Sequence, residues 1–218
     1  MAEMRTDEEQ VEAIKDWWKR NGSSLLIGIV AALAIVFGWQ AWQDHQAEKR
    51  SVAAAQFSKL VNSLGEGSDE ERTETVGYLA KELQENFEDS AYAIYATLIL
   101  AQQQLMDQAE PEAAEASLEW AHARVEGGSA LELIVRSRLA QAQFAAGRHD
   151  EALETLDGAG ETGEFAGIYS ELQGDILLAK GDRAAAEEAY RSAREASTSG
   201  QNGLLELKLS DLAIGEDV

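Results

Sequence analysis

The chain has no cysteine, and its basic residues are scarce beside the acidic ones. Without cysteine it forms no disulfide, holds no thiolate zinc site and offers no cysteine nucleophile. Its 18 lysines and arginines stand against 40 aspartates and glutamates, so the formal charge is −22. Phosphate backbones and anionic lipid headgroups repel such a surface. The composition therefore argues against nucleic-acid binding and against adsorption flat on a membrane.

Proline is also nearly absent, with one residue in 218. The 18 glycines fall mostly between runs of apolar residues at helical spacing, where they separate helices. The hydrophobic content of 45% is ordinary for a chain that packs a core. We therefore expect an all-α protein.

One stretch carries no charge at all, the nineteen residues from Ser24 to Trp42. At about 1.5 Å per residue, a helix of this length crosses a hydrocarbon core of about 30 Å. Tryptophans near both ends and basic residues before the start are typical of membrane interfaces. We predict that six residues lie there: Trp17, Trp18, Lys19, Arg20, Trp39 and Trp42.

This span is a permanent anchor, a cleaved signal, or a buried helix of a soluble protein. A small-x-small cleavage pattern comes only at Ala53-Ala54-Ala55, well beyond Trp42, which favours the anchor. Lys19 and Arg20 lie directly before the span, which favours a cytoplasmic N-terminus. The predicted parts are a cytoplasmic tail with a short amphipathic helix (1–23), a transmembrane helix (24–42) and a helical repeat domain on the other side (43–218).

In the tail, "TDEEQVEAIKDWWKRNG" predicts a short helix. Thr6 and Glu9 have the spacing of a capping box, and Asn21-Gly22 is a common helix stop. An apolar stripe runs along one side: Val11, Ile14 and Trp18. This helix either lies on the membrane or on a partner, or is a lead-in to the span with no further role.

The region after the span predicts paired helices. Residues 47–64 and 70–87 read as a first helical hairpin. Beyond it, residues of one kind recur after 34 positions: Ala140 and Gly174, Phe144 and Leu178, Gly147 and Gly181, Ala152 and Ala186, Leu156 and Tyr190, and Ala159 and Ala193. A spacing of about 34 residues is that of the tetratricopeptide repeat, a helix pair that needs small residues where its helices cross.

A degraded earlier copy and a cap complete the predicted array. The earlier copy fits if its turn holds one extra residue, and its matching positions are Ala101, Ala114, Leu118 and Ala121. After Gly200, three leucines at helical spacing predict a helix that caps the last repeat: Leu205, Leu209 and Leu212. The expected fold is thus all-α, a single N-terminal transmembrane helix followed by a tetratricopeptide-like α-solenoid.

Arrays of this kind usually bind peptides on the concave surface made by their first helices. In this register the candidate peptide-binding residues are Tyr95, Leu98, Gln102, Leu105, Ile134, Gln141, Ile168, Glu171 and Asp175. Phe144 and Leu178 either join them or are buried between repeats. The predicted groove is apolar and mildly acidic, and it lacks the lysines and asparagines with which some tetratricopeptide modules clamp an acidic C-terminus.

No residue pattern predicts an enzyme, a metal site or a cofactor site. The histidines have no partner at helical spacing and no carboxylate arrangement typical of a metal site: His45, His122 and His149. Nucleophile elbows, phosphate-binding glycine loops and dinucleotide fingerprints are absent from the sequence. We therefore expect a binding protein without catalytic residues.

The whole chain resembles the ancillary SecYEG translocon subunit family. The most specific segments are "DEEQVEAIKDWWKRNG", which leads into the span, and "GWQAWQDHQ", which covers its end. The two repeats that contain "AAGRHDEA" and "AKGDRAAA" agree with the family as well but are less specific. The resemblance implies a single-pass protein of the bacterial inner membrane with a periplasmic repeat domain. It also implies three partners: the SecYEG translocon, a membrane-anchored periplasmic chaperone of the prolyl-isomerase type, and unfolded secretory proteins leaving the channel.

Three functions are compatible with these patterns. The first is a periplasmic chaperone adaptor at the translocon, which we favour. The second is a membrane-anchored envelope scaffold that organises resident complexes and never contacts translocating clients. The third is a membrane-tethered enzyme, which would need a cleft with converging polar groups.

Overall fold

The computed structural model describes residues 7–197 and 203–214 of the chain, and in these ranges it contains helices and no strand. The α-helices are α1 (Asp7–Ser63), α2 (Asp69–Asn86), α3 (Ala91–Met106), α4 (Pro111–His122), α5 (Ala130–Ala145), α6 (His149–Asp157), α7 (Ala166–Ala179), α8 (Arg183–Ala196) and α9 (Gly203–Ile214). A short 3-10 turn, η1 (Gly163–Phe165), precedes α7. The expectation of an all-α protein is confirmed. The chain divides after Val52 into two compact units, residues 1–52 and 53–218.

The first unit consists of the N-terminal part of α1, which runs without a break through Asn21 and Gly22. The expected helix stop at these two residues is wrong. The Asn21 side chain donates to the carbonyl oxygen of Trp17 one turn back, at 3.1 Å, and so stays within the helix. Gly22 leaves room for the Trp18 ring, which lies 3.2 Å from the place of an added Cβ. Thr6 of the expected capping box lies outside the described residues.

The uncharged stretch of α1 exposes its apolar side chains all round. Ile27, Ile35 and Phe37 are 70%, 72% and 64% exposed. A helix of a soluble core would bury such side chains, whereas lipid accepts them on every side. By length and composition α1 is the one helix among the described residues that could cross a membrane.

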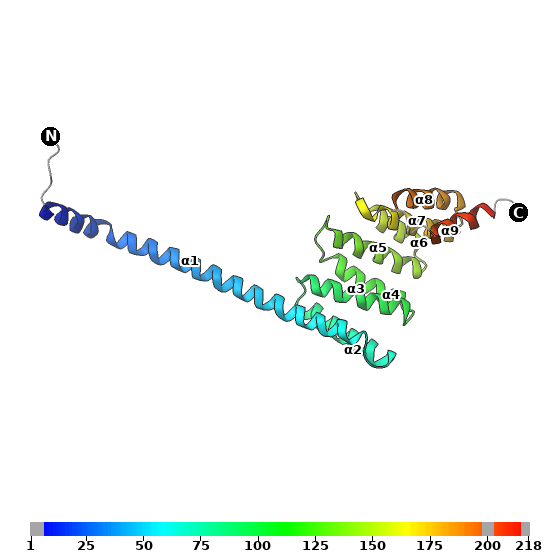
Figure 1. The fold of residues 1–218 in the computed structure, drawn as a ribbon, viewed down its shortest axis with the longest axis horizontal. Coiled ribbons are helices and arrows are strands. Elements are labelled where there is room, and N and C mark those ends of the chain that lie inside the picture. The colour runs from blue at the N-terminus through cyan, green and yellow to red at the C-terminus, as the bar shows by residue number, and fades with distance from the viewer. Residues whose placement is uncertain (1–6, 198–202, 215–218) are drawn as a thin grey trace, which may run out of the picture. The chain divides into compact units, whose positions relative to one another are not determined.

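The second unit is a series of antiparallel helix pairs (Figure 1). The last turns of α1 pair with α2, then α3 with α4, α5 with α6, and α7 with α8. The first helices of the pairs also form a row, since α3 contacts α5 and α5 contacts α7. We call the side of this row that carries the candidate residues the first-helix face.

The small residues expected at the helix crossings lie where the two helices of a pair touch. Ala140, Ala152 and Ala186 have no exposed surface. A Cβ added at Gly174 would lie 2.5 Å from the ring of Tyr190, so this position admits only glycine without a shift. The 34-residue register is therefore the register of the fold.

The turns within the helix pairs show why the first copy departs from the 34-residue spacing. Gly147 and Gly181 follow α5 and α7 with φ of 77° and 86°, a conformation that glycine adopts without strain. The turn after α3 spans residues 107–110, against 146–148 and 180–182 in the other pairs, which confirms the extra residue. Ala109 takes the glycine's place in this longer turn, with φ of 53°.

Helix α9 covers the last pair, as expected of a cap. Leu205 and Leu212 are buried against Ala186, Tyr190 and Ala193 of α8. Arg183 at the start of α8 donates to the carbonyl oxygen of Leu212 at 2.9 Å. Without α9, this apolar side of α8 would face water.

Candidate peptide-binding face

The nine candidate residues all lie on the first helices, and each is exposed or half-buried. Helix α3 carries Tyr95, Leu98, Gln102 and Leu105, α5 carries Ile134 and Gln141, and α7 carries Ile168, Glu171 and Asp175. Phe144 and Leu178 are half-buried and pack against core residues, and the candidates Leu98 and Leu105 do the same. Burial therefore does not distinguish Phe144 and Leu178 from these two candidates.

A groove opens between α3 and α5, with a volume of about 470 Å³. It brings together three of the candidates, Leu98, Gln102 and Ile134. Six further residues line it that the sequence reasoning missed: Leu64, Arg72, Ile99, Gln103, Asp107 and Arg138. Arg138 lies one helical turn after Ile134, so helical spacing could have found it. Leu64 and Arg72 come from the turn before α2 and from α2 itself, which no spacing within α3 or α5 reveals.

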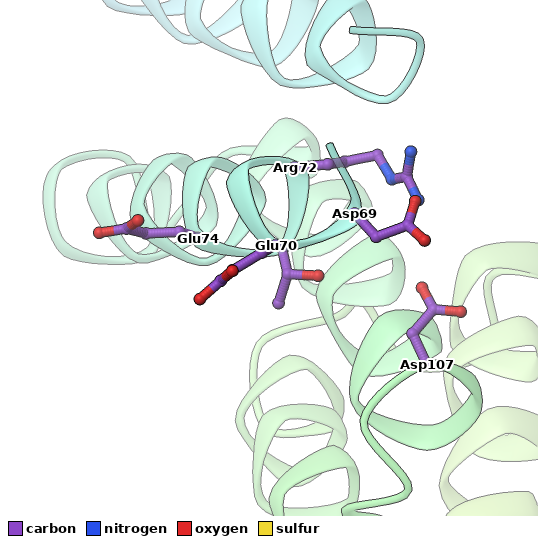
Figure 2. A pocket seen from close by; sticks show the side chains of 6 residues that line it. Asp69, Glu70, Arg72, Glu74 and Asp107 are labelled. Atoms are coloured by element: carbon purple, nitrogen blue, oxygen red, sulfur yellow. The ribbon is translucent and has the colours of Figure 1, made fainter. Parts of the chain in front are cut away.

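Beside this groove lies a second, polar depression of about 580 Å³ (Figure 2). Its lining residues come from the start of α2 and the turn after α3: Asp69, Glu70, Arg72, Thr73, Glu74 and Asp107. The guanidinium of Arg72 pairs with Asp69, and Asp107 faces this pair from the turn after α3 in Figure 2. The charge of Arg72 is therefore offset by neighbouring carboxylates.

The α7 end of the first-helix face is occupied by the chain itself. Lys208 of α9 donates to Glu171 at 2.8 Å and to both carboxylate oxygens of Asp175 at 2.7 and 2.9 Å. Tyr190 of α8 donates to Asp175 at 2.7 Å. The two acidic candidates thus belong to an internal ion cluster and are not free to bind a ligand.

Protonation in this cluster follows from burial and from these bonds. Burial raises the pKa of Tyr190, and the adjacent carboxylates of Asp175 and Glu171 raise it further. Burial by itself would lower the pKa of Lys208, but its bonds to Asp175 and Glu171 outweigh burial and raise it. Lys208 therefore stays charged and Tyr190 stays neutral near neutral pH.

A buried contact joins α7 to α5 between the two ends of the face. The hydroxyl of Tyr169 donates to the carbonyl oxygen of Leu133 at 2.8 Å. Burial, aided by the negative charge of Glu132, raises the pKa of Tyr169 to about 12. Glu132 is itself held by Arg136 at 2.6 Å. This contact holds α7 against α5.

The six predicted membrane-interface residues lie on α1 in the first unit. Four of them are tryptophans with half or more of their surface exposed: Trp17, Trp18, Trp39 and Trp42. The rings of Trp39 and Trp42 lie 5.1 Å apart. Lys19 and Arg20 are exposed beside the first two tryptophans. Their place at an interface stays a prediction.

Taken together, the paired helices, their glycine turns and the capping helix define a protein of the tetratricopeptide-like class that carries a candidate membrane span. The family of tetratricopeptide repeat-like domains matches residues 15–214. The chain also belongs to the family of ancillary SecYEG translocon subunits, which confirms the resemblance seen in the sequence. The match covers nearly the whole chain, including α1.

Three relatives show how far this similarity extends. The ancillary SecYEG translocon subunit of Haemophilus influenzae is 33% identical over 97% of this chain and 100% of its own length. The protein of that name from Escherichia coli is 30% identical over 95% of this chain and 97% of its own. The one from Neisseria gonorrhoeae is 26% identical over 97% of this chain and 100% of its own length.

Proposed function

We propose that this protein is a non-enzymatic subunit associated with the Sec translocon, where it acts as a periplasmic chaperone adaptor. Its α1 helix anchors it in the bacterial inner membrane, and its repeat domain binds a partner chaperone and emerging secretory proteins. Membership of the ancillary SecYEG translocon subunit family supports the association with the translocon. The names of the relatives mention neither a chaperone nor clients, so binding to these two is our proposal.

The groove between α3 and α5 is the observation that carries the adaptor role. It offers Leu98 and Ile99 of α3 and Ile134 of α5 as apolar contacts, with polar groups beside them. An extended, unfolded chain presents apolar side chains and unpaired backbone groups together, and such a groove complements both. The described residues include no grouping of histidine and carboxylate side chains that could hold a metal ion.

The orientation follows from the charges at the start of the span. Lys19 and Arg20 precede it, so the N-terminus stays in the cytoplasm and residues 43–218 enter the periplasm. Protease added to cells with an opened outer membrane should digest the repeat domain while the inner membrane is intact. Digestion that begins only after the inner membrane is broken would show the opposite orientation.

An envelope scaffold is the second candidate, because Lys208 and α9 close the α7 end of the face to clients. Purification from gently solubilised membranes that contain a stalled secretory precursor separates the two functions. An adaptor recovers the translocon, the prolyl-isomerase-type chaperone and the precursor. A scaffold recovers resident proteins only, and their amounts do not respond to the precursor.

A truncated chain provides the control for this purification. Deletion of residues 24–42, with export by a cleavable signal, removes the uncharged span and leaves a strongly acidic domain. We expect this form to be soluble and helical and, in membranes without a stalled precursor, to lose the translocon. Loss of helical content would mean that the span belongs to the fold of the repeat domain.

A further inference from the structure

We propose that the groove between α3 and α5 selects extended peptide segments in which a carboxylate lies close to an apolar side chain. Arg138 would bind the carboxylate, and Leu98 and Ile134 would contact the apolar side chain. This inference rests on the proposed function in one respect, that the groove binds extended peptides. It adds the chemical class of the segment that is bound.

Arg138 is the cation left without a carboxylate on this face. Its side chain is exposed and donates only to the amide oxygen of Gln141, at 3.0 Å, among the residues that the structure describes. The other arginines after α1 are held within the domain, by carboxylates or, for Arg183, by backbone carbonyls: Arg72, Arg124, Arg136, Arg148, Arg183, Arg191 and Arg194. In so acidic a domain, an arginine that meets no carboxylate is available for a carboxylate from outside.

Gln103 supplies a second and independent observation. This residue lines the groove with 5% of its surface exposed, and its amide oxygen has no hydrogen-bond partner among the described residues. A buried amide oxygen that accepts no hydrogen bond is costly, and buried polar groups are nearly always paired. A backbone N–H of a bound segment could supply the missing donor. An extended peptide carries such donors along its length, whereas a folded surface hides them.

The charges around the groove also determine where the carboxylate of a ligand can bind. Asp107 lines the same groove, and Arg72 beside it is already paired with Asp69. That wall therefore offers no free positive charge, and Asp107 repels a carboxylate there. Arg138 on α5 is left as the place where a ligand's carboxylate can bind, with Ile134 one turn before it.

The overall charge of the domain makes the preference testable. At long range the acidic surface repels every acidic peptide, and salt screens that repulsion within about 10 Å. A preference for an acidic peptide over its neutral counterpart must therefore come from a local cation. General attraction cannot produce it.

The test uses the intact chain in detergent and two short, unstructured fluorescent peptides that differ at one position. One contains Leu-Ala-Asp and the other Leu-Ala-Asn. We expect the aspartate peptide to bind about fivefold more tightly, as an exposed ion pair allows, with a smaller ratio at high salt. R138Q should abolish this ratio, and R138K should retain part of it.

Arg191→Gln is the matched control, because Arg191 lies on α8, pairs with Glu187 and does not line the groove. This variant should keep the full ratio. Equal binding of the two peptides by the unaltered chain would overturn the inference and leave the proposed function standing, as would a ratio that survives in R138Q. If neither peptide binds, both the inference and the proposed peptide groove are wrong.

Discussion

The two ends of the first-helix face are built from the same kind of helix pair, yet they treat their polar groups in opposite ways. Between α3 and α5, Arg138 meets no carboxylate among the described residues and the amide oxygen of Gln103 meets no donor. At α7, Glu171 and Asp175 share the single ammonium group of Lys208. The polar groups between α3 and α5 therefore lack partners within the described chain, whereas those at α7 find a partner in α9.

The difference follows from where each pair stands in the array. The pair α7–α8 is the last one, and α9 covers it with Leu205 and Leu212. That covering helix brings Lys208 over the acidic residues of α7. The α3–α5 groove lies inside the array, and no such helix covers it among the residues that the structure describes, so Arg138 is exposed. The repeats by themselves would give a uniform first-helix face. The capping helix α9 restricts binding at one end of that face.

The largest effect is expected from overpacking the closed end. Ala186 has no exposed surface and lies against Tyr190 and Leu205, so Ala186→Leu should destabilise the domain by about 1–3 kcal/mol. Ala184→Leu, on the exposed side of α8, should change little. Thermal unfolding compares the two variants, and hydrogen exchange in α9 should increase only for Ala186→Leu. Equal melting temperatures and equal protection of α9 would contradict the role of α8 and α9 as one packed end.

A smaller effect is expected where α7 joins α5. Tyr169→Phe removes the hydrogen bond to the carbonyl oxygen of Leu133, which should cost about 1 kcal/mol of unfolding free energy. Denaturant unfolding measures this at neutral pH. A cost near zero would mean that the hydroxyl does not hold the two ends together.

The same tyrosine makes the stability depend on pH in alkali. The pKa of Tyr169 is about 12 in the folded chain against an ordinary 10.0, so the folded state keeps a proton that the unfolded chain loses. Its contribution is complete below pH 10 and is lost as the pH rises towards 12. Tyr169→Phe should therefore lose less stability than the unaltered chain over that interval.

The smallest effect on stability is expected at Lys208. Its ion pairs are partly exposed, so Lys208→Gln should cost no more than about 1 kcal/mol. The variant frees Glu171 and Asp175, and a lysine-containing peptide should then bind where the unaltered chain binds it weakly. Peptide titration against both forms measures this. Unchanged binding would mean that α9 closes this end by covering it and not by neutralising it.

The sequence predicts the array well because its packing depends on local size. Ala140, Ala152 and Gly174 stand where helices cross closely, and only small residues fit there. Even the extra residue in the turn that holds Ala109 follows from the period. The continuous α1 helix was missed because the Asn21 side chain bonds within the helix, which its identity does not reveal.

The candidate surface is less predictable, because its state depends on residues distant in sequence. Asp175 and Lys208 are 33 positions apart, and only the path of α9 brings them together. Whether Arg138 is paired depends on every carboxylate around it in space. Helical spacing can place such residues on a face, but it cannot show which of them another helix has already bound.

The most direct test of this account is a photo-crosslinking comparison between Ile134 and Ile168 on the intact chain in the membrane. A photoreactive residue is placed at one position at a time while a secretory precursor is stalled in the translocon. Ile168, at 58% exposed, is the more accessible of the two, so chance collisions would favour it. The account predicts that the precursor crosslinks to position 134 and much less to position 168. Equal crosslinking, or more at position 168, would contradict the claim that the groove between α3 and α5 binds the clients.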